Sequence, residues 1–167
     1  MKPIPRKVQR GSNRYNLDKQ PITRSDGPGT RGRKYILVNK QRQHAIDRKA
    51  MHRFLSELLK HLEVHHRPFS VVFISDGAMR RYNRQYRGFD KPTDVLSFPG
   101  DYGYLGDILI SSQTAYNQAL KSVTLSFETN LRRLVLHGLL HLMGYDHETD
   151  EGQMRALERR LRRRFKC

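Results

Sequence analysis

The chain has 167 residues, 32 of them Lys or Arg and 16 Asp or Glu, which gives a formal net charge of +16. This length predicts one domain that can bury a core without disulfides, and the single cysteine, Cys167, excludes an intramolecular disulfide. No apolar run is long enough to span a membrane, and the basic start lacks the apolar stretch of a signal peptide. We therefore expect a soluble, cytoplasmic protein with no membrane partner, and a frayed thiol at Cys167.

The positive charge is concentrated at the two ends of the sequence. Residues 1–34 carry ten Lys or Arg and two Asp, and residues 155–167 carry seven Lys or Arg and one Glu. Such basic segments favour a polyanionic partner, because each neutralised phosphate releases counterions. For the N-terminal segment, a solvated tail that keeps the protein soluble is an equal explanation. Residues 1–33 have almost no apolar side chains, so we predict a flexible extension there and a folded domain over residues 34–167.

The domain begins with alternating strand and helix patterns. We expect a strand at YILVN (35–39), a helix over 44–62 and a buried strand over 69–75. A short helix should follow, from the N-cap pair Ser75 and Asp76 to about Tyr86. After it we expect an edge strand over 93–99 between two prolines, a strand over 104–111 and a helix over 112–121.

The next predicted helix, from about Ser126 to Met143, is apolar on nearly every side and is therefore expected to be buried. A last helix, from about Asp150 to Phe165, runs into the basic sequence RRLRRRFK. This order of elements indicates an α+β fold: a single domain in which a small mixed β-sheet packs against a central buried helix, with further helices around it.

The central helix ends in HGLLHLMGYDH, which places three histidines at the spacing of a metal site. His137 and His141 are four residues apart, so they lie on one helix face and both reach a zinc ion at about 2.0–2.1 Å. Gly144 can adopt the left-handed conformation that ends a helix and so bring His147 back toward them. We predict one Zn²⁺ ion with three histidine ligands and a water, the open coordination of a catalytic site; nickel or another divalent ion would also bind.

The histidine spacing is also that of HExxHxxGxxH metallopeptidases. Those enzymes carry a glutamate as general base where this chain has Gly138. A glycine can neither accept a proton nor orient a water molecule. The comparison therefore supports the metal site and speaks against a peptidase.

A second block, NRQYRGFDKPTDVLSFP followed by LGDILIS, precedes the histidine motif. The two blocks in this order resemble the YbeY family of bacterial rRNA maturation factors, which are zinc-dependent endoribonucleases. The resemblance implies that His137, His141 and His147 bind the zinc and that Arg87, in the YRG triplet, is needed for activity. It further implies a single-strand-specific endoribonuclease that processes the 3′ end of 16S rRNA, takes part in ribosome quality control, and has ribosomal RNA precursors and the small subunit as partners.

The residues around Arg87 are compatible with RNA binding. Arg80, Arg84 and Arg87 lie at i, i+4 and i+7, so a helix would present them as one basic stripe. A guanidinium can bind a phosphate through two parallel hydrogen bonds and stabilise charge on phosphorus. We therefore predict RNA contacts for Arg80 and Arg84, with a solvated helix face as the alternative.

Three acidic residues are candidates for a general base or for orienting a ligand histidine: Asp107, Asp146 and Glu148. Asp107 could equally be a structural residue whose hydrogen bonds are satisfied within the fold. Asp146 could equally be a residue that forms the turn. Because no base is evident, a non-catalytic RNA-binding ribosome assembly factor, with a zinc that only stabilises the fold, stays open beside the endoribonuclease hypothesis.

Overall fold

The computed structural model describes residues 34–62, 64, 67–101, 103–146 and 150–167, and the account below concerns these residues. The predicted flexible extension (1–33), His147 and Glu148 lie outside the described part of the chain. None of the described helices is both long enough and apolar enough to cross a membrane.

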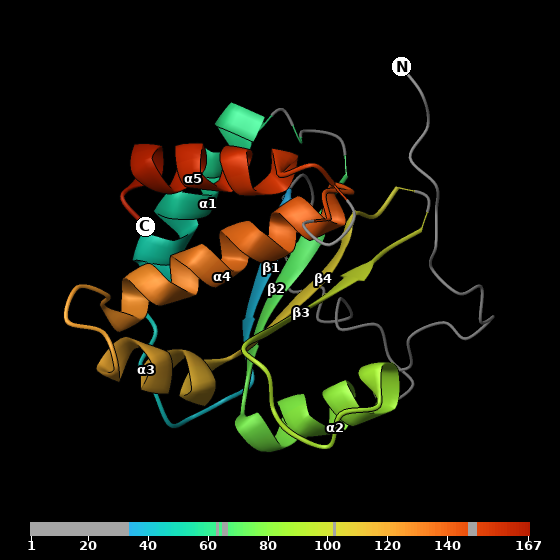
Figure 1. The fold of residues 1–167 in the computed structure, drawn as a ribbon, viewed down its shortest axis with the longest axis vertical. Helices are drawn as coiled ribbons and strands as arrows, with labels where there is room; N and C mark the ends of the chain where they lie inside the picture. The colour runs from blue at the N-terminus through green and yellow to red at the C-terminus, as the bar shows by residue number, and fades with distance from the viewer. Residues whose placement is uncertain (1–33, 63, 65–66, 102, 147–149) are drawn as a thin grey trace, which may run out of the picture. The chain divides into compact units, whose positions relative to one another are not determined.

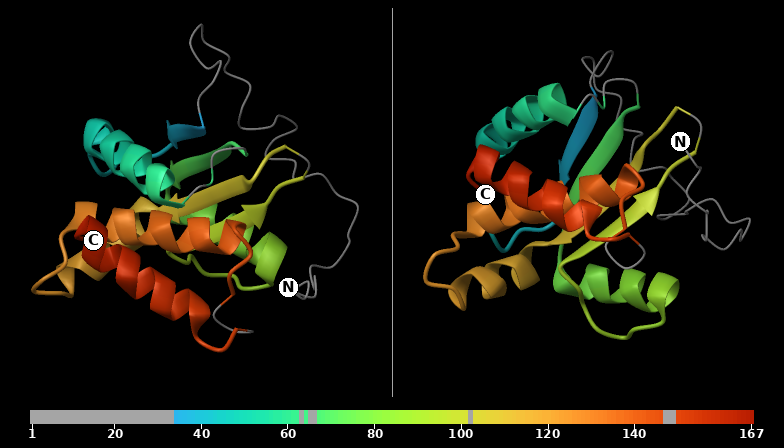
Figure 2. Two further views of the ribbon diagram at one scale, coloured as in Figure 1. Left: turned by 90° about the horizontal axis from the view of Figure 1, so that it is seen from above. Right: turned by 45° about the horizontal axis from the view of Figure 1, so that its top comes forward.

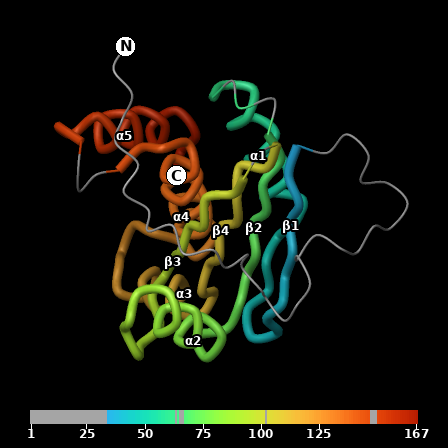
Figure 3. The backbone as a smooth tube through the Cα atoms, turned by 90° about the vertical axis from the view of Figure 1, so that its right-hand side faces the viewer, coloured from blue at the N-terminus to red at the C-terminus, as the bar shows by residue number. Residues whose placement is uncertain are grey.

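Within the described part of the chain, four strands form one mixed sheet in the order β1-β2-β4-β3 (Figure 1). Their bounds are Tyr35–Asn39 for β1, Phe69–Ile74 for β2, Val95–Pro99 for β3 and Gly106–Ser111 for β4. β1, β2 and β4 are parallel, and β3 pairs antiparallel with β4. β1 and β3 are the two edge strands, as Figure 3 shows. The prediction of an edge strand next to Pro99 is thereby confirmed, since proline cannot donate to a central ladder.

Around the sheet, the described residues form five helices: α1 (Arg48–Leu62), α2 (Asp76–Arg87), α3 (Ser112–Leu120), α4 (Phe127–Leu142) and α5 (Gln153–Phe165). A serine caps the N-terminus of three helices: Ser75 caps α2, Ser111 caps α3 and Ser126 caps α4. In each case the serine side chain accepts a hydrogen bond from a backbone N–H in the first turn of the helix. The predicted α+β fold, with one small mixed sheet and a central helix, is confirmed.

Two helices begin later than their periodicity predicts, because an aspartate caps each first turn. The Asp47 carboxylate accepts the Ala50 N–H at 2.9 Å, so α1 starts at Arg48 and not at residue 44. The Asp150 carboxylate accepts the Gly152 and Met154 N–H groups, each at 2.8 Å, so α5 starts at Gln153. Residues 44–47 and 150–152 therefore precede the two helices.

The main core lies between α1, α4 and α5 and one face of the sheet. Nine α4 residues are buried, as the sequence predicts for a helix that is apolar nearly all round. On the other face a smaller buried group includes Val72, Leu109 and Met79, the last from α2. Figure 2 (left) shows α5 on the outer side of α4, away from the strands.

At Gly138, α4 lies close against the sheet. A Cβ atom there would lie 2.6 Å from Ile108 Cγ2 and 3.0 Å from Ser97 Oγ. The Ser97 hydroxyl donates to the Gly138 carbonyl at 3.2 Å and so fastens the helix to β3. Because Gly138 faces the sheet, the histidines on either side of it in the motif are fixed relative to β3 and β4.

Cys167 differs from our expectation of a frayed thiol. Cys167 is only 6% exposed and belongs to the main hydrophobic cluster. Its backbone N–H donates to the Arg162 carbonyl at 3.0 Å. Burial raises the pKa of the Cys167 thiol despite the nearby arginine charges. The final residue therefore packs as part of the core.

Candidate metal centre

The side chains of His137 and His141 converge at the C-terminal end of α4. Their Nε2 atoms are 3.1 Å apart, and the two rings meet edge to face at an interplanar angle of 80°. Two nitrogen ligands of one tetrahedral zinc, each at about 2.0–2.1 Å, lie about 3.3 Å from each other. The pair is therefore spaced as two ligands of a single zinc ion would be.

The chain reverses direction directly after this pair. Gly144 has a φ of 92°, and its N–H donates to the His141 carbonyl at 3.0 Å. The Tyr145 N–H donates to the Leu140 carbonyl at 3.1 Å, which completes the end of the helix. The predicted left-handed turn at Gly144 is confirmed. The third predicted ligand, His147, follows this turn and lies outside the described residues.

No group of three His, Cys, Asp or Glu side chains that could hold a metal occurs among the residues with described positions. Among the described residues, the candidate metal ligands at the end of α4 are His137 and His141. A three-histidine centre therefore depends on His147, and that ligand stays a prediction.

Glu158 of α5 is a functional candidate that the sequence analysis missed. Its carboxylate oxygen lies 3.2 Å from His137 Nδ1 and accepts a hydrogen bond from Arg162 Nη2 at 2.7 Å. Burial acts to raise the pKa of Glu158, but the hydrogen bond with His137 and the charge of Arg162 outweigh it and lower that pKa. An ionised carboxylate at Nδ1 keeps the proton there, so the Nε2 lone pair is available to a metal.

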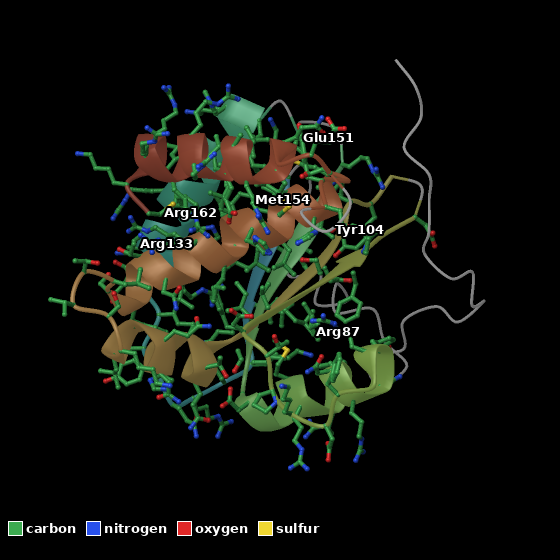
Figure 4. The ribbon with its side chains drawn as sticks, viewed as in Figure 1. Arg87, Tyr104, Arg133, Glu151, Met154 and Arg162 are labelled. Carbon is green, nitrogen blue, oxygen red and sulfur yellow. The ribbon has the colours of Figure 1, made fainter. Side chains whose placement is uncertain are left out.

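A sequence signal for Glu158 does exist in hindsight, because it is the only acidic residue in the basic run 155–167. Its side chain is 13% exposed, whereas the arginines beside it in sequence, Arg159 and Arg160, are exposed. Figure 4 shows Arg162 and Met154 on the side of α5 that faces α4, which is the side to which Glu158 also contributes its contact with His137.

Arg87, the last residue of α2, is exposed, and its guanidinium carbon lies 5.8 Å from the centre of the Phe89 ring. Gly88 ends the helix in the left-handed conformation, with a φ of 76°. Among residues that the structure describes, Arg87 makes no ion pair. Figure 4 shows Arg87 on the side of the molecule where α4 ends. Its charge is therefore accessible to a bound anion.

The predicted stripe of three arginines is divided by Asp90. Arg80 makes a two-point ion pair with Asp90, Nε to Oδ1 at 2.9 Å and Nη2 to Oδ2 at 2.6 Å. Arg84 Nη1 lies 3.9 Å from the same carboxylate. The hydrogen bond and charge of Arg80 lower the pKa of Asp90, which therefore stays ionised. Arg80 holds the segment after α2 in place, and RNA binding by Arg80 and Arg84 stays a prediction.

Asp107 is a satisfied polar group. It accepts hydrogen bonds from the Tyr104 hydroxyl at 2.6 Å and from the Ser70 hydroxyl. Burial and the bond to Asp107 raise the pKa of Tyr104, which stays protonated as a donor. Asp107 follows Gly106 in β4 and precedes Ile108, which contacts Gly138, so its side chain points to the opposite face from α4. This arrangement fits the structural interpretation of Asp107.

For Asp146, the structure adds a role in the turn after α4. Its backbone carbonyl accepts the Asp150 N–H at 2.9 Å, which helps to connect this turn to the start of α5. Glu158 thus provides a histidine contact that the sequence did not predict, and a role of Asp146 or Glu148 in orienting a histidine or as a general base stays a prediction.

Comparisons with known proteins point to one family over most of the chain. The profile of the family described as Endoribonuclease YbeY matches residues 36–166. A protein of Persephonella marina named Endoribonuclease YbeY is 38% identical over 130 residues, which cover 73% of this chain and 84% of that protein. A protein of the same name from Geobacter sulfurreducens is 37% identical over 141 residues, covering 79% and 93% of the two chains.

The fold also resembles a solved structure. The solution structure of TM1509 from Thermotoga maritima matches with a TM-score of 0.56 and 26% sequence identity. The match covers 75% of this chain and 85% of that protein. This likeness agrees with the mixed sheet and surrounding helices described above.

Proposed function

The chain belongs to the Endoribonuclease YbeY family, and from this premise we propose that it is a zinc-dependent, single-strand-specific endoribonuclease of late ribosomal RNA processing. Its substrate is the 3′ end of the 16S rRNA precursor in the cytoplasm, on or near the small ribosomal subunit, and it acts in ribosome quality control. The observation that carries the metal part of the proposal is the Nε2 pair of His137 and His141, 3.1 Å apart, with Glu158 at the other nitrogen of His137.

The residues present fit a zinc ion. His137 and His141 would hold it together with His147, and Glu158 keeps the ring of His137 in the tautomer and orientation that a metal requires. When bound, zinc supplies Lewis-acid chemistry, which polarises a phosphodiester toward attack by water.

Arg87 would bind the same phosphodiester. Its exposed guanidinium can donate two parallel hydrogen bonds to phosphate oxygens and neutralise the charge that develops in the transition state. The Phe89 ring beneath it limits the orientations that Arg87 can adopt. We therefore assign it the role of electrostatic stabiliser.

The packing around Gly138 strengthens the case against a peptidase. A glutamate could not replace this glycine without displacing Ile108 or Ser97, because even its Cβ atom would lie 2.6 Å from Ile108 Cγ2. A side chain at position 138 would also be directed toward the sheet and not toward the histidine nitrogens. The position that holds the general base in HExxH peptidases is therefore closed to one here.

The proposal is tested by cleavage of a structured rRNA 3′-end precursor with protein of known zinc content. Wild type is compared with Arg87→Ala and His141→Ala, and circular dichroism checks that each variant folds. Arg81→Ala is the matched control, because Arg81 is exposed on the same helix and its Nη1 donates to the Gly77 carbonyl of that helix.

We expect cleavage by wild type and the Arg81 variant, and none by the other two. Equal cleavage by all four proteins would reveal a contaminating nuclease and favour the non-catalytic assembly factor. Loss of folding in the His141 variant alone, with full activity in Arg87→Ala, would do the same, because zinc would then serve only the fold.

A further inference from the structure

The outward side of α5 carries an unusual density of positive charge. Its exposed basic side chains are Arg155, Arg159, Arg160, Arg163 and Arg164, which we call the α5 arginine face, followed by Lys166. Over residues 152–167 the only acidic residue, Glu158, lies on the inner side against His137. The face therefore has no acidic residue of its own helix to neutralise it.

The spacing of these arginines makes them neighbours. Arg155, Arg159 and Arg163 follow one another at i+4, so successive side chains are about 6 Å apart along the helix axis. Among residues of described position none of the three makes an ion pair. Like charges at this spacing destabilise a helix. A merely solvated face would need no such uniform charge, so an anionic partner is the better explanation.

The basic surface continues from α5 onto the end of α1. A hollow of about 600 Å³ between the two helices is lined by Lys60, His61, Arg164, Phe165, Lys166 and one acidic residue, Glu57. Three permanent positive charges surround this hollow. It extends the arginine face laterally and offers room for a phosphate group beside the helix.

The composition of the face favours a nucleic acid over a membrane or a protein. Arginine donates to phosphate oxygens through two parallel bonds, and here it outnumbers lysine. A membrane-binding helix inserts large apolar residues, and protein interfaces use them as anchors. Among the described residues, the large exposed apolar side chains are Phe89, Tyr116, Leu120 and Val123, and all four lie outside α5.

The two sides of α5 differ in what surrounds them. Glu158 points inward to the histidine pair, whereas Arg155, Arg159 and Arg163 point outward. Figures 1 and 2 show that the outer side of α5 is not covered by another described element. A helix with its side chains is about 10–12 Å across. A single nucleotide bound at the histidines would lie on the inner side of α5, whereas a longer RNA can reach both sides.

We infer that the α5 arginine face is a second RNA-binding surface, which binds the phosphate backbone of structured RNA outside the cleavage site. This inference rests on the proposed function, since it takes RNA as the substrate. The surface anchors long substrates and contributes nothing to oligonucleotides that fill only the metal centre. Its contacts go to phosphates, so they are independent of sequence and weaken with salt.

The test measures RNA binding without cleavage, by fluorescence anisotropy of zinc-loaded full-length protein on RNA whose tail carries cleavage-resistant phosphorothioate linkages. The probes are a hairpin with a single-stranded 3′ tail and a hexanucleotide identical to that tail. The variant is Arg155→Gln/Arg159→Gln/Arg163→Gln. The matched control, Lys40→Gln/Arg42→Gln/Lys121→Gln, removes the same charge from exposed positions outside α5.

We expect the α5 variant to bind the hairpin about tenfold more weakly at low salt, and to lower the slope of log affinity against log salt by about three. The control should lower affinity much less, and hexanucleotide binding should be the same in all three proteins. Equal losses in the variant and its control, or no loss, would overturn the inference, because net charge alone would then explain hairpin binding.

Two further arms separate this inference from the function itself. Vesicles with a quarter of phosphatidylserine test the alternative anion: loss of vesicle binding with intact hairpin binding would overturn the RNA assignment. Cleavage of the hexanucleotide with ordinary phosphodiester linkages, by zinc-loaded protein, tests the proposed function alone. A protein that cleaves the hexanucleotide but shows unchanged hairpin binding in the α5 variant is a nuclease without this second surface.

Discussion

The carboxylate of Glu158 lies 3.2 Å from Nδ1 of His137, across 21 positions of sequence. Through this contact α5 reaches the histidine pair of α4, and Glu158 holds the nitrogen of His137 that would face away from a metal ion bound at Nε2. Arg162, one turn later in α5, donates to the same carboxylate at 2.7 Å and keeps it ionised and oriented. In the proposed zinc site, docking of α5 and metal binding would therefore be coupled.

The first prediction concerns this coupling. Glu158→Ala should weaken zinc binding by about 10–100-fold, because partners of ligand histidines contribute that much to metal affinity. Glu158→Gln keeps an acceptor but loses the negative charge, so its affinity should fall between those of wild type and Glu158→Ala. Competition with a chromophoric chelator measures each affinity. Glu151→Gln, an exposed glutamate before α5, is the control. Wild-type affinity in both Glu158 variants would mean that the contact does not orient His137.

The second prediction concerns the close approach of α4 to the sheet. Gly138→Ala should destabilise the fold by about 1–3 kcal/mol, the usual cost of overpacking, although alanine favours a helix over glycine by about 1 kcal/mol. Its Cβ atom would lie 2.6 Å from Ile108 Cγ2 and 3.0 Å from Ser97 Oγ. Chemical denaturation gives the free energy of unfolding.

Gly77→Ala provides the matched control for Gly138. It also lies in a helix, α2, but an added Cβ atom would meet nothing within 4 Å. This variant should be unchanged or slightly more stable, by up to about 1 kcal/mol. If both substitutions stabilised the protein, Gly138 would not be required by packing against the sheet.

The sequence predicted the elements that hydrophobic period and local capping determine. The run FSVVFI became β2, buried at all six positions, and Ser75 caps α2 as expected. The errors at the starts of α1 and α5 have one cause. An aspartate can cap a turn or lie inside a helix, and which of the two applies depends on where its carboxylate finds a donor.

The candidate site was predictable where its residues are close in sequence. Two histidines four residues apart can only share a face once their helix is known, so the His137 and His141 pair followed from spacing. Glu158 could not be placed in this way, because its contact with His137 depends on how α5 packs on α4. Likewise, the sequence did not predict the ion pair of Arg80 with Asp90, because the pair depends on how the chain folds back after α2.

The third prediction concerns the thiol of Cys167. Because burial raises its pKa, the folded protein should react with a disulfide reagent such as DTNB far more slowly than an exposed cysteine, whose pKa is about 8.5. The rate should rise as the pH increases beyond the ordinary range of a thiol, since only the thiolate reacts. The same protein in guanidinium chloride is the control, and there the reaction should be fast. A fast reaction in the native state would show that the last residue is frayed after all.

The last prediction separates the charge of Arg87 from its geometry. Arg87→Ala should lower kcat for RNA cleavage by about 100-fold, the usual effect of removing a donor that stabilises transition-state charge. Arg87→Lys keeps the charge but cannot bind a phosphate through two parallel bonds, so it should restore only part of this loss. Neither change should alter zinc content or stability, because Arg87 is exposed and makes no ion pair among the described residues. Single-turnover cleavage at saturating protein isolates the chemical step from binding. Full activity of Arg87→Lys would show that positive charge alone is needed, whereas full activity of Arg87→Ala would remove Arg87 from the site.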